Sequence, residues 1–196
     1  MMSWLGTHYV EILGVILSLL YLNFSIRQNI LLWPLGIASA LLYMVVFFQS
    51  KFYADMGLNA YYVLVSIYGW ILWSRWRDDK GSELPVSRLG WKMAMVLLLI
   101  TAIAFGLIGF ILDRYTDSPV PYWDAFTTAL SFTATWMLAR KILENWILWI
   151  IVDAVSMGLY LYRGLYPTLF LFAVYTTMAV IGYMKWRRSY LSQNHA

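Results

Sequence analysis

Long apolar stretches alternate with short polar connections along the whole chain. Each stretch approaches the ~20 mostly apolar residues that an α-helix needs to cross the ~30 Å hydrocarbon core of a bilayer. The pattern predicts seven spans, at residues 9–26, 30–48, 57–74, 93–112, 122–139, 146–162 and 167–184. A backbone in lipid has to pair its own N–H and C=O groups, so we expect helices rather than strands. The longest polar connection is 75–90.

Composition agrees with a lipid-facing surface. Of the 196 residues, 62% are hydrophobic and 12% charged, against about 25% charged residues in a soluble domain. So few charges cannot cover a water-soluble globule, which excludes an ordinary soluble enzyme, a disordered chain and a nucleic-acid-binding module. The first residues, Met1-Met2-Ser3-Trp4, lack a positively charged region, so we expect no cleavable signal peptide.

Basic residues are distributed unevenly between the two ends of the predicted spans. One side collects Arg27, Arg75, Arg77, Lys80, Arg88, Lys92, Arg140, Lys141, Lys185, Arg187 and Arg188, and the other only Lys51, Arg114 and Arg163. Because Lys and Arg concentrate in cytoplasmic loops, we expect the N-terminus outside and the C-terminus in the cytoplasm.

The chain also repeats itself at a distance of 113 residues. This shift places Ser18 on Ser131, Arg27 on Arg140, Tyr62 on Tyr175, Gly69 on Gly182 and Trp73 on Trp186, whereas pairing 29–33 with 145–149 needs a shift three residues longer. We therefore expect residues 1–196 to form one membrane domain with repeats at 9–74 and 122–186 and a linker helix at 91–112. Equivalent helices lie four apart, an even number, which predicts a 3+1+3 arrangement of parallel repeats.

The sixth predicted helix carries the clearest candidate site. Trp146, Trp149 and Asp153 are spaced i, i+3 and i+7, which places them within about 60° of one another on one face. Aromatic faces together with a carboxylate suit a flat, positively charged ligand. The alternative assigns Trp146 to the membrane interface and lets Asp153 bond a neighbouring helix. We favour the site, because ionisable residues at this depth are usually functional.

The third predicted helix carries a matching polar and aromatic face. It consists of Asn59, Tyr62, Ser66, Trp70 and Trp73, at spacings of 3, 4, 4 and 3. Asn and Ser do not belong on a lipid-facing surface, although packing explains Tyr62 equally well and the interface is the better explanation for Trp73. Hydroxyls on the fifth helix, at Thr127, Ser131 and Thr135, bond their own backbone as often as a ligand.

Motifs of enzymes and cofactor sites are missing from the sequence. There is no Gly-x-Ser-x-Gly, no His-Glu-x-x-His and no phosphate-binding Gly-Lys-Ser/Thr, and the absence of cysteine excludes thiolate metal sites. We therefore expect no enzymatic activity and no cofactor.

Several of these runs together resemble the PnuC family of bacterial vitamin transporters. They are Phe48-Gln49-Ser50-Lys51-Phe52-Tyr53-Ala54, Ile67-Tyr68-Gly69-Trp70, Tyr122-Trp123-Asp124, and Glu144-Asn145-Trp146-Ile147-Leu148-Trp149 with Asp153 completing a Trp-x-x-Trp-x-x-x-Asn/Asp motif. The resemblance covers nearly the whole chain. It implies a uniporter of the bacterial inner membrane for a small vitamin precursor, with nicotinamide riboside the family's type substrate and a cytoplasmic kinase that traps it.

The same resemblance implies a binding site and leaves the substrate open. It places the ligand between the third and sixth helices, at Asn59, Tyr62, Ser66, Trp70, Asn145, Trp146, Trp149 and Asp153. The nicotinamide riboside branch carries Gln, Asn and Asn where Asn59, Ser66 and Asp153 stand here. Because a carboxylate at 153 suits any cation, thiamine is a close rival. A membrane receptor or assembly subunit and a sugar carrier are the alternatives of other classes, and a homo-oligomer is compatible with the sequence.

Overall fold

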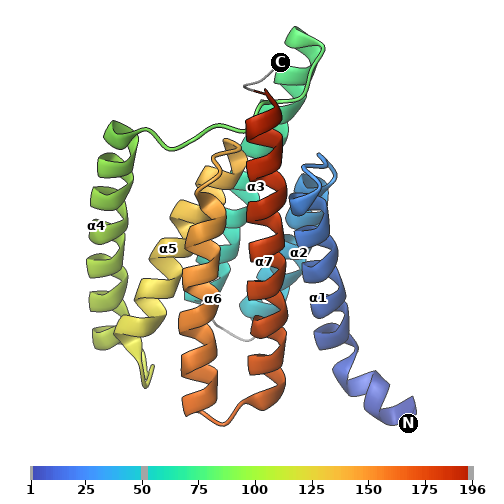
Figure 1. Cartoon of the computed structure of the whole chain (residues 1–196). Helices are drawn as coiled ribbons and strands as arrows, with labels where there is room; N and C mark the ends of the chain where they lie inside the picture. Colours follow the sequence, from blue (N-terminus) through green and yellow to red (C-terminus); the bar gives the residue numbers. More distant parts are fainter. Residues whose placement is uncertain (1, 50–52, 194–196) are drawn as a thin grey trace. The chain divides into compact units, whose positions relative to one another are not determined.

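The computed structural model describes residues 2–49 and 53–193, and their regular structure is helical apart from one isolated bridge between Ser87 and Ile142. The helices are α1 (Met2–Ile26), α2 (Leu32–Gln49), α3 (Tyr53–Lys80), α4 (Trp91–Tyr115), α5 (Pro121–Ala139), α6 (Asn145–Tyr162) and α7 (Tyr166–Gln193) (Figure 1). Every predicted span corresponds to one of them, which confirms the all-α class. Part of the run 48–54 lies outside the described residues.

Four helices of the described residues are long and apolar enough to cross a membrane. They cover Met56–Arg77, Trp91–Tyr115, Asn145–Tyr162 and Tyr166–Gln193, while the apolar stretches Gly14–Ile26 and Leu32–Val45 are shorter. Helix α5 is not in this group, and its sequence is rich in Thr and Ser. The total of seven membrane spans therefore remains a prediction.

Two helices extend well past the ends that the apolar pattern predicts. Helix α3 continues to Lys80 and α7 to Gln193, so the predicted connection 75–90 is wrong in its first six positions. The added turns contain four Arg and two Lys, which favour helix about as well as Leu does. Gly81, with φ of 65° and its N–H donating to Arg77 O at 2.9 Å, ends α3 in the left-handed conformation that glycine adopts at little cost.

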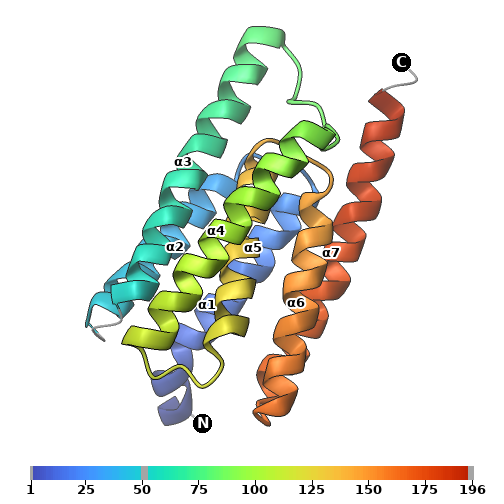
Figure 2. The ribbon, with the colours of Figure 1, turned by 90° about the vertical axis from the view of Figure 1, so that its left-hand side faces the viewer.

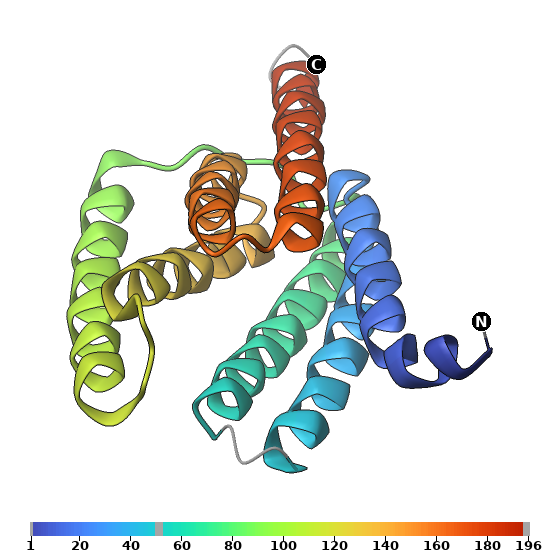
Figure 3. The same ribbon diagram turned by 90° about the horizontal axis from the view of Figure 1, so that it is seen from below.

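The chain divides into two compact units, Met1–Leu84 and Pro85–Ala196. In the first unit α2 contacts both α1 and α3, and in the second α6 contacts both α5 and α7. Figures 2 and 3 show the pairs α2–α3 and α6–α7 running side by side. The second unit has one further helix, α4, which packs on α5. The order of neighbours in α1–α3 thus recurs in α5–α7.

The turns that enter α2 and α6 have the same hydrogen bonds at a constant shift of 113. Gln28 and Lys141 both have positive φ, 55° and 51°. Four backbone hydrogen bonds of the first turn recur in the second, each atom shifted by 113 residues. In the first turn they are Arg27 N–Asn23 O, Gln28 N–Ser25 O, Asn29 N–Phe24 O and Leu32 N–Asn29 O. In the second they are, in the same order, Arg140 N–Trp136 O, Lys141 N–Leu138 O, Ile142 N–Met137 O and Asn145 N–Ile142 O. The expected extra shift of three residues in this region is therefore wrong, and Trp33 corresponds to Trp146.

A buried tryptophan fixes the contact between the last two helices of each unit. In the first unit Trp33 meets Trp73 edge to face, with ring centroids 5.3 Å apart, and also covers Gly69. In the second, Trp146 meets Trp186 at 5.5 Å and covers Gly182. A Cβ on Gly182 would stand 2.6 Å from Trp146 Cη2. Only hydrogen fits at this position while the indole stays in place.

We expect Gly182→Ala to lower the melting temperature of the purified protein in detergent. The new methyl group overlaps the Trp146 ring, and overpacking of this kind costs about 1–3 kcal/mol. Gly158→Ala is the matched control: its Cβ would meet nothing within 4 Å, so the better helix propensity of alanine should hold or raise the melting temperature. Equal melting temperatures for the two variants would contradict the Trp146–Gly182 contact.

Candidate functional site

The face of α6 that the sequence singles out lies largely inside the second unit. Asn145, Trp146 and Asp153 are 0%, 1% and 6% exposed, and Trp149 is half-buried. Ser156, which the sequence analysis did not select, is also buried and lies three residues after Asp153. Its spacing from Trp149 and Asp153 is the signal that identifies it, since 149, 153 and 156 share one helix face.

Two polar atoms at the start of α6 are buried without a hydrogen-bond partner among the described residues. Asn145 donates from Nδ2 to Ile142 O at 2.6 Å, but its Oδ1 accepts nothing, and Trp146 Nε1 donates to nothing. Trp33 Nε1 is in the same state in the first unit. Buried donors and acceptors of this kind are rare in native structures, because each costs about 1–3 kcal/mol when unpaired. A ligand or an ordered water suits both atoms.

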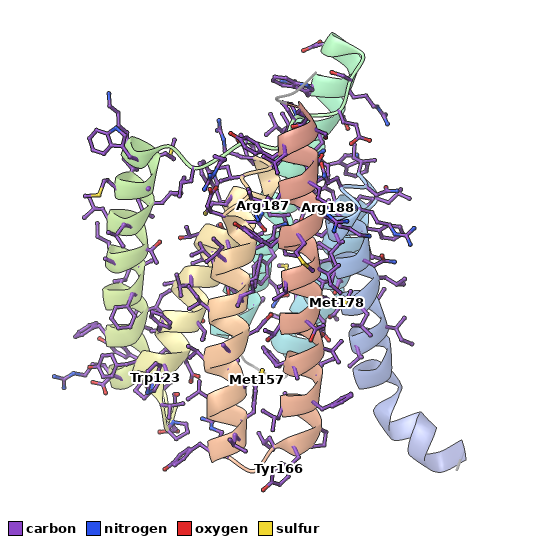
Figure 4. All side chains as sticks on the ribbon, in the orientation of Figure 1. Trp123, Met157, Tyr166, Met178, Arg187 and Arg188 are labelled. Atoms are coloured by element: carbon purple, nitrogen blue, oxygen red, sulfur yellow. The ribbon has the colours of Figure 1, made fainter. Side chains whose placement is uncertain are left out.

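Trp146 is a packing residue as well as a candidate contact. Its indole lies between α6 and α7 against Trp186 and Gly182, so it does not belong to the membrane interface. Figure 4 shows Met157, two turns further along α6 than Trp149, pointing toward α7, where its Sδ accepts a hydrogen bond from Thr176 Oγ1 at 3.6 Å. These contacts hold the α6 face that carries Asp153 in a fixed rotation relative to α7.

The predicted face of α3 is partly buried within the first unit. Asn59 and Ser66 are buried, Tyr62 is half-buried and Trp70 is 43% exposed. Trp73 is buried against Trp33, so its expected position at the membrane interface is wrong. The reason is that Gly69, one turn earlier on α3, has no side chain. Trp33 can therefore approach α3 closely enough to pack against Trp73.

The hydroxyl groups of α5 bond their own helix. Thr127 donates to Trp123 O and Asp124 O, Ser131 to Thr127 O and Thr135 to Ser131 O, at 2.7–3.1 Å. Each hydroxyl hydrogen is therefore committed to the backbone, and the oxygens retain only acceptor capacity. Of the two interpretations that the sequence left open for these residues, the structure therefore agrees with bonding to the backbone.

The segment before α4 is tied to the turn that begins α6. Ser87 pairs on both sides, donating to Lys141 O at 3.0 Å and accepting from Leu143 N at 2.9 Å. Glu144 then accepts hydrogen bonds from Arg88 Nε at 3.0 Å and from Leu89 N at 2.8 Å. The hydrogen bond and the charge of Glu144 raise the pKa of the exposed Arg88 guanidinium. We call residues 85–90 and 140–144 the clamp; sequence spacing alone gave no signal for it.

The chemistry available on α6 is recognition rather than bond making. A buried carboxylate with two neighbouring indoles on one helix favours a cationic, flat molecule. Among the described residues no three His, Cys, Asp or Glu side chains are grouped so that they could hold a metal ion.

Comparison with known proteins places the chain among membrane transporters. A family model described as "Nicotinamide mononucleotide transporter" matches residues 8–188. The chain belongs to this family, the PnuC family. The match covers both units and includes every residue of the α6 and α3 faces, so the predicted resemblance is confirmed.

Characterised relatives and a solved structure agree with this membership. The chain is 24% identical over 92% of its length to the nicotinamide riboside transporter PnuC of Escherichia coli (strain K12), and covers 86% of that protein. It is 23% identical to the riboflavin/roseoflavin transporter RibM of Streptomyces davaonensis, covering 94% of this chain and 92% of RibM. The crystal structure of the vitamin B3 transporter PnuC superposes with a TM-score of 0.75 at 20% identity, over 99% of this chain and 86% of the other.

These findings assign the broad role of the protein. It is a multi-pass protein of the bacterial inner membrane with a transport function rather than an enzymatic one, as the sequence predicted. The superposition at 20% identity establishes the fold.

We expect Asn145→Leu to keep or raise the melting temperature. Leu32, fully buried, holds the corresponding position in the first unit, and leucine removes the unpaired Oδ1, which costs about 1–3 kcal/mol. Asn145→Asp should instead lower the melting temperature, because it buries an uncompensated charge. Thermal unfolding in detergent measures both. A lower melting temperature for Asn145→Leu would mean that the amide is needed for folding and not free for a ligand.

Proposed function

We propose that this protein carries nicotinamide riboside across the inner membrane by facilitated diffusion. The observation that carries the proposal is the buried Asp153, on the same face of α6 as Trp149. Nicotinamide riboside is a permanent cation with a flat ring, and a carboxylate beside aromatic faces is the arrangement that recognises such a molecule. Relatives named as nicotinamide riboside transporters support the same substrate.

We assign substrate contacts to both units. On α6 they are Asn145, Trp146, Trp149 and Asp153, and on α3 they are Asn59, Tyr62, Ser66 and Trp70. The unpaired Oδ1 of Asn145 and Nε1 of Trp146 support the first set. The exposed face of Trp70 and the buried polar groups of Asn59 and Ser66 support the second.

Thiamine is the second candidate substrate. It is also a permanent cation, and Asp153 provides a full negative charge where an amide would suffice for a ribose hydroxyl. RibM, which is named as a riboflavin/roseoflavin transporter, illustrates that proteins similar to this chain carry different vitamins.

We propose the 3+1+3 arrangement, with parallel repeats α1–α3 and α5–α7 and α4 as the linking helix. The matching turns, Trp–Gly contacts and order of neighbours support it. Basic residues support the orientation. At the end of the second unit that holds the clamp lie Arg88, Lys92, Arg140, Lys141, Lys185, Arg187 and Arg188, and at the other end lie Arg114 and Arg163. Figure 4 shows Arg187 and Arg188 toward one end of α7 and Tyr166 at the other. We place the basic end in the cytoplasm.

Facilitated diffusion implies that the substrate is consumed inside the cell. A cytoplasmic kinase that phosphorylates it would keep the inward gradient without ion coupling, because a phosphorylated product no longer fits a site built for a cation. The test is uptake into liposomes that hold only the purified protein. We expect uptake to stop when the internal and external concentrations are equal, with or without an ion gradient. Accumulation above that level would mean coupled transport.

The substrate is decided by calorimetric titration of the purified protein with nicotinamide riboside, thiamine and riboflavin side by side. We expect nicotinamide riboside to bind most tightly. Tighter binding of thiamine would transfer the assignment to the second candidate. A protein that binds none of the three and moves none of them in liposomes would favour a receptor or assembly subunit.

We expect Asp153→Ala to raise the Kd for the substrate by at least about tenfold, because hydrogen bonds to charged groups contribute about 1.5–3 kcal/mol. The melting temperature should stay close to that of the wild type. Asp153→Asn separates charge from shape: it should weaken a bond to a cation but retain one to a hydroxyl. Asp113→Ala, an exposed carboxylate at the end of α4, is the control. Unchanged affinity in Asp153→Ala would remove Asp153 from the site.

A further inference from the structure

The two units differ sharply at one pair of equivalent positions. Gly36 on α2 and Trp149 on α6 are 113 residues apart, the shift that relates the turns and the buried tryptophans of the two units. One position has no side chain and the other has the largest one. Both helices leave their turns with the same backbone hydrogen bonds, so the two positions are equivalent in the repeat.

In the first unit the space beside Gly36 is filled from both sides. A Cβ on Gly36 would stand 3.0 Å from Tyr21 Cε2 on α1 and 3.2 Å from Ser66 Oγ on α3. The Tyr21 ring therefore supplies the aromatic volume at this level, and glycine is what leaves room for it.

In the second unit the equivalent neighbours are both alanine. Ala134 on α5 corresponds to Tyr21, and Ala179 on α7 corresponds to Ser66. They are 0% and 1% exposed. At this level the second unit therefore has its aromatic side chain, Trp149, on the second helix of the repeat, and alanine at the equivalent positions of the first and third helices.

A second tyrosine-on-glycine contact of the first unit lies two turns away, between the same two helices α1 and α2. A Cβ on Gly14 would collide with the hydroxyl of Tyr43 in the first unit. The equivalent residues of the second unit are Thr127 and Ser156. Both tyrosine-on-glycine contacts of α1 and α2 are therefore replaced between α5 and α6, on either side of the level of Asp153.

We propose that Ala134 and Ala179 are positioning residues for Trp149: as its small neighbours they fix where the indole lies and so how much room remains for the ring of the substrate. The inference rests on the proposed role of Trp149 as a substrate contact. It extends the site to α5 and α7, through residues with no polar group of their own, and it explains why the first unit, with Tyr21 in this space, has no equivalent indole.

A double-mutant cycle on the melting temperature tests the shared space without any ligand. Ala134→Tyr overpacks the space and Trp149→Gly leaves a cavity in it. Each should lower the melting temperature by about 2–10 °C. The double variant recreates the Tyr21–Gly36 pair, so it should melt higher than Ala134→Tyr alone. A decrease equal to the sum of the two single decreases would mean that the residues do not share a space, and would overturn the proposal.

Titration with nicotinamide riboside tests the positioning role with milder variants. Ala134→Val should raise the Kd by at least about tenfold, while Ala134→Ser should leave it within about twofold. The matched control is Ala125→Val on the same helix, because Ala125 is fully buried but faces Gly109 of α4, 3.6 Å from a Cβ placed there. It should lower the melting temperature as much as Ala134→Val and leave the Kd unchanged.

Failure of the positioning role and failure of the proposed substrate give different experimental results. Equal effects of Ala134→Val and Ala125→Val on the Kd, or no effect of Ala134→Val, would overturn the positioning role while the substrate stands. If the wild-type protein does not bind nicotinamide riboside, the proposed substrate fails and the cycle on the melting temperature alone decides whether Ala134 and Trp149 share a space.

Discussion

In each unit a tryptophan from the middle helix occupies the space beside a glycine of the last helix, and the other contacts of the unit depend on that approach. Trp33 meets Gly69 and Trp73, and Trp146 meets Gly182 and Trp186. In lipid, where burial of apolar surface no longer drives helices together, such close packing against small residues is the main source of cohesion. The rotation of α6 that places Asp153 inside the second unit follows from it.

The repeated framework explains where the chemistry lies. Positions that match between the units include the two tryptophan–glycine pairs, which hold helices together, and one of these residues, Trp146, is also a proposed contact. Two other proposed contacts lie at positions that differ: Trp149 stands where the first unit has Gly36, and Asp153 where it has Ala40. The duplicated scaffold thus keeps its tryptophan–glycine packing in both copies, while the side chains around Asp153 differ between them.

The sequence predicted the helices well, because apolar runs of membrane length have few alternatives. It also selected the α6 face, since a carboxylate within such a run stands out. It was wrong for the ends of α3 and α7, because polar residues beyond the bilayer continue a helix without any apolar signal. It was wrong for Trp73, since indoles of the core and of the interface have the same composition. The clamp depends on backbone hydrogen bonds between distant segments, which side-chain patterns do not encode.

The clamp has a consequence for the continuity of the chain. Ser87 is bonded on both sides and Glu144 holds Leu89, so the polypeptide is attached to the second unit from Val86 onward. Helix α3 ends at Lys80, and the covalent link between the units is reduced to a few residues after it. The clamp therefore lies within the second unit alone, and cleavage of the chain between Lys80 and Pro85 would leave its hydrogen bonds intact.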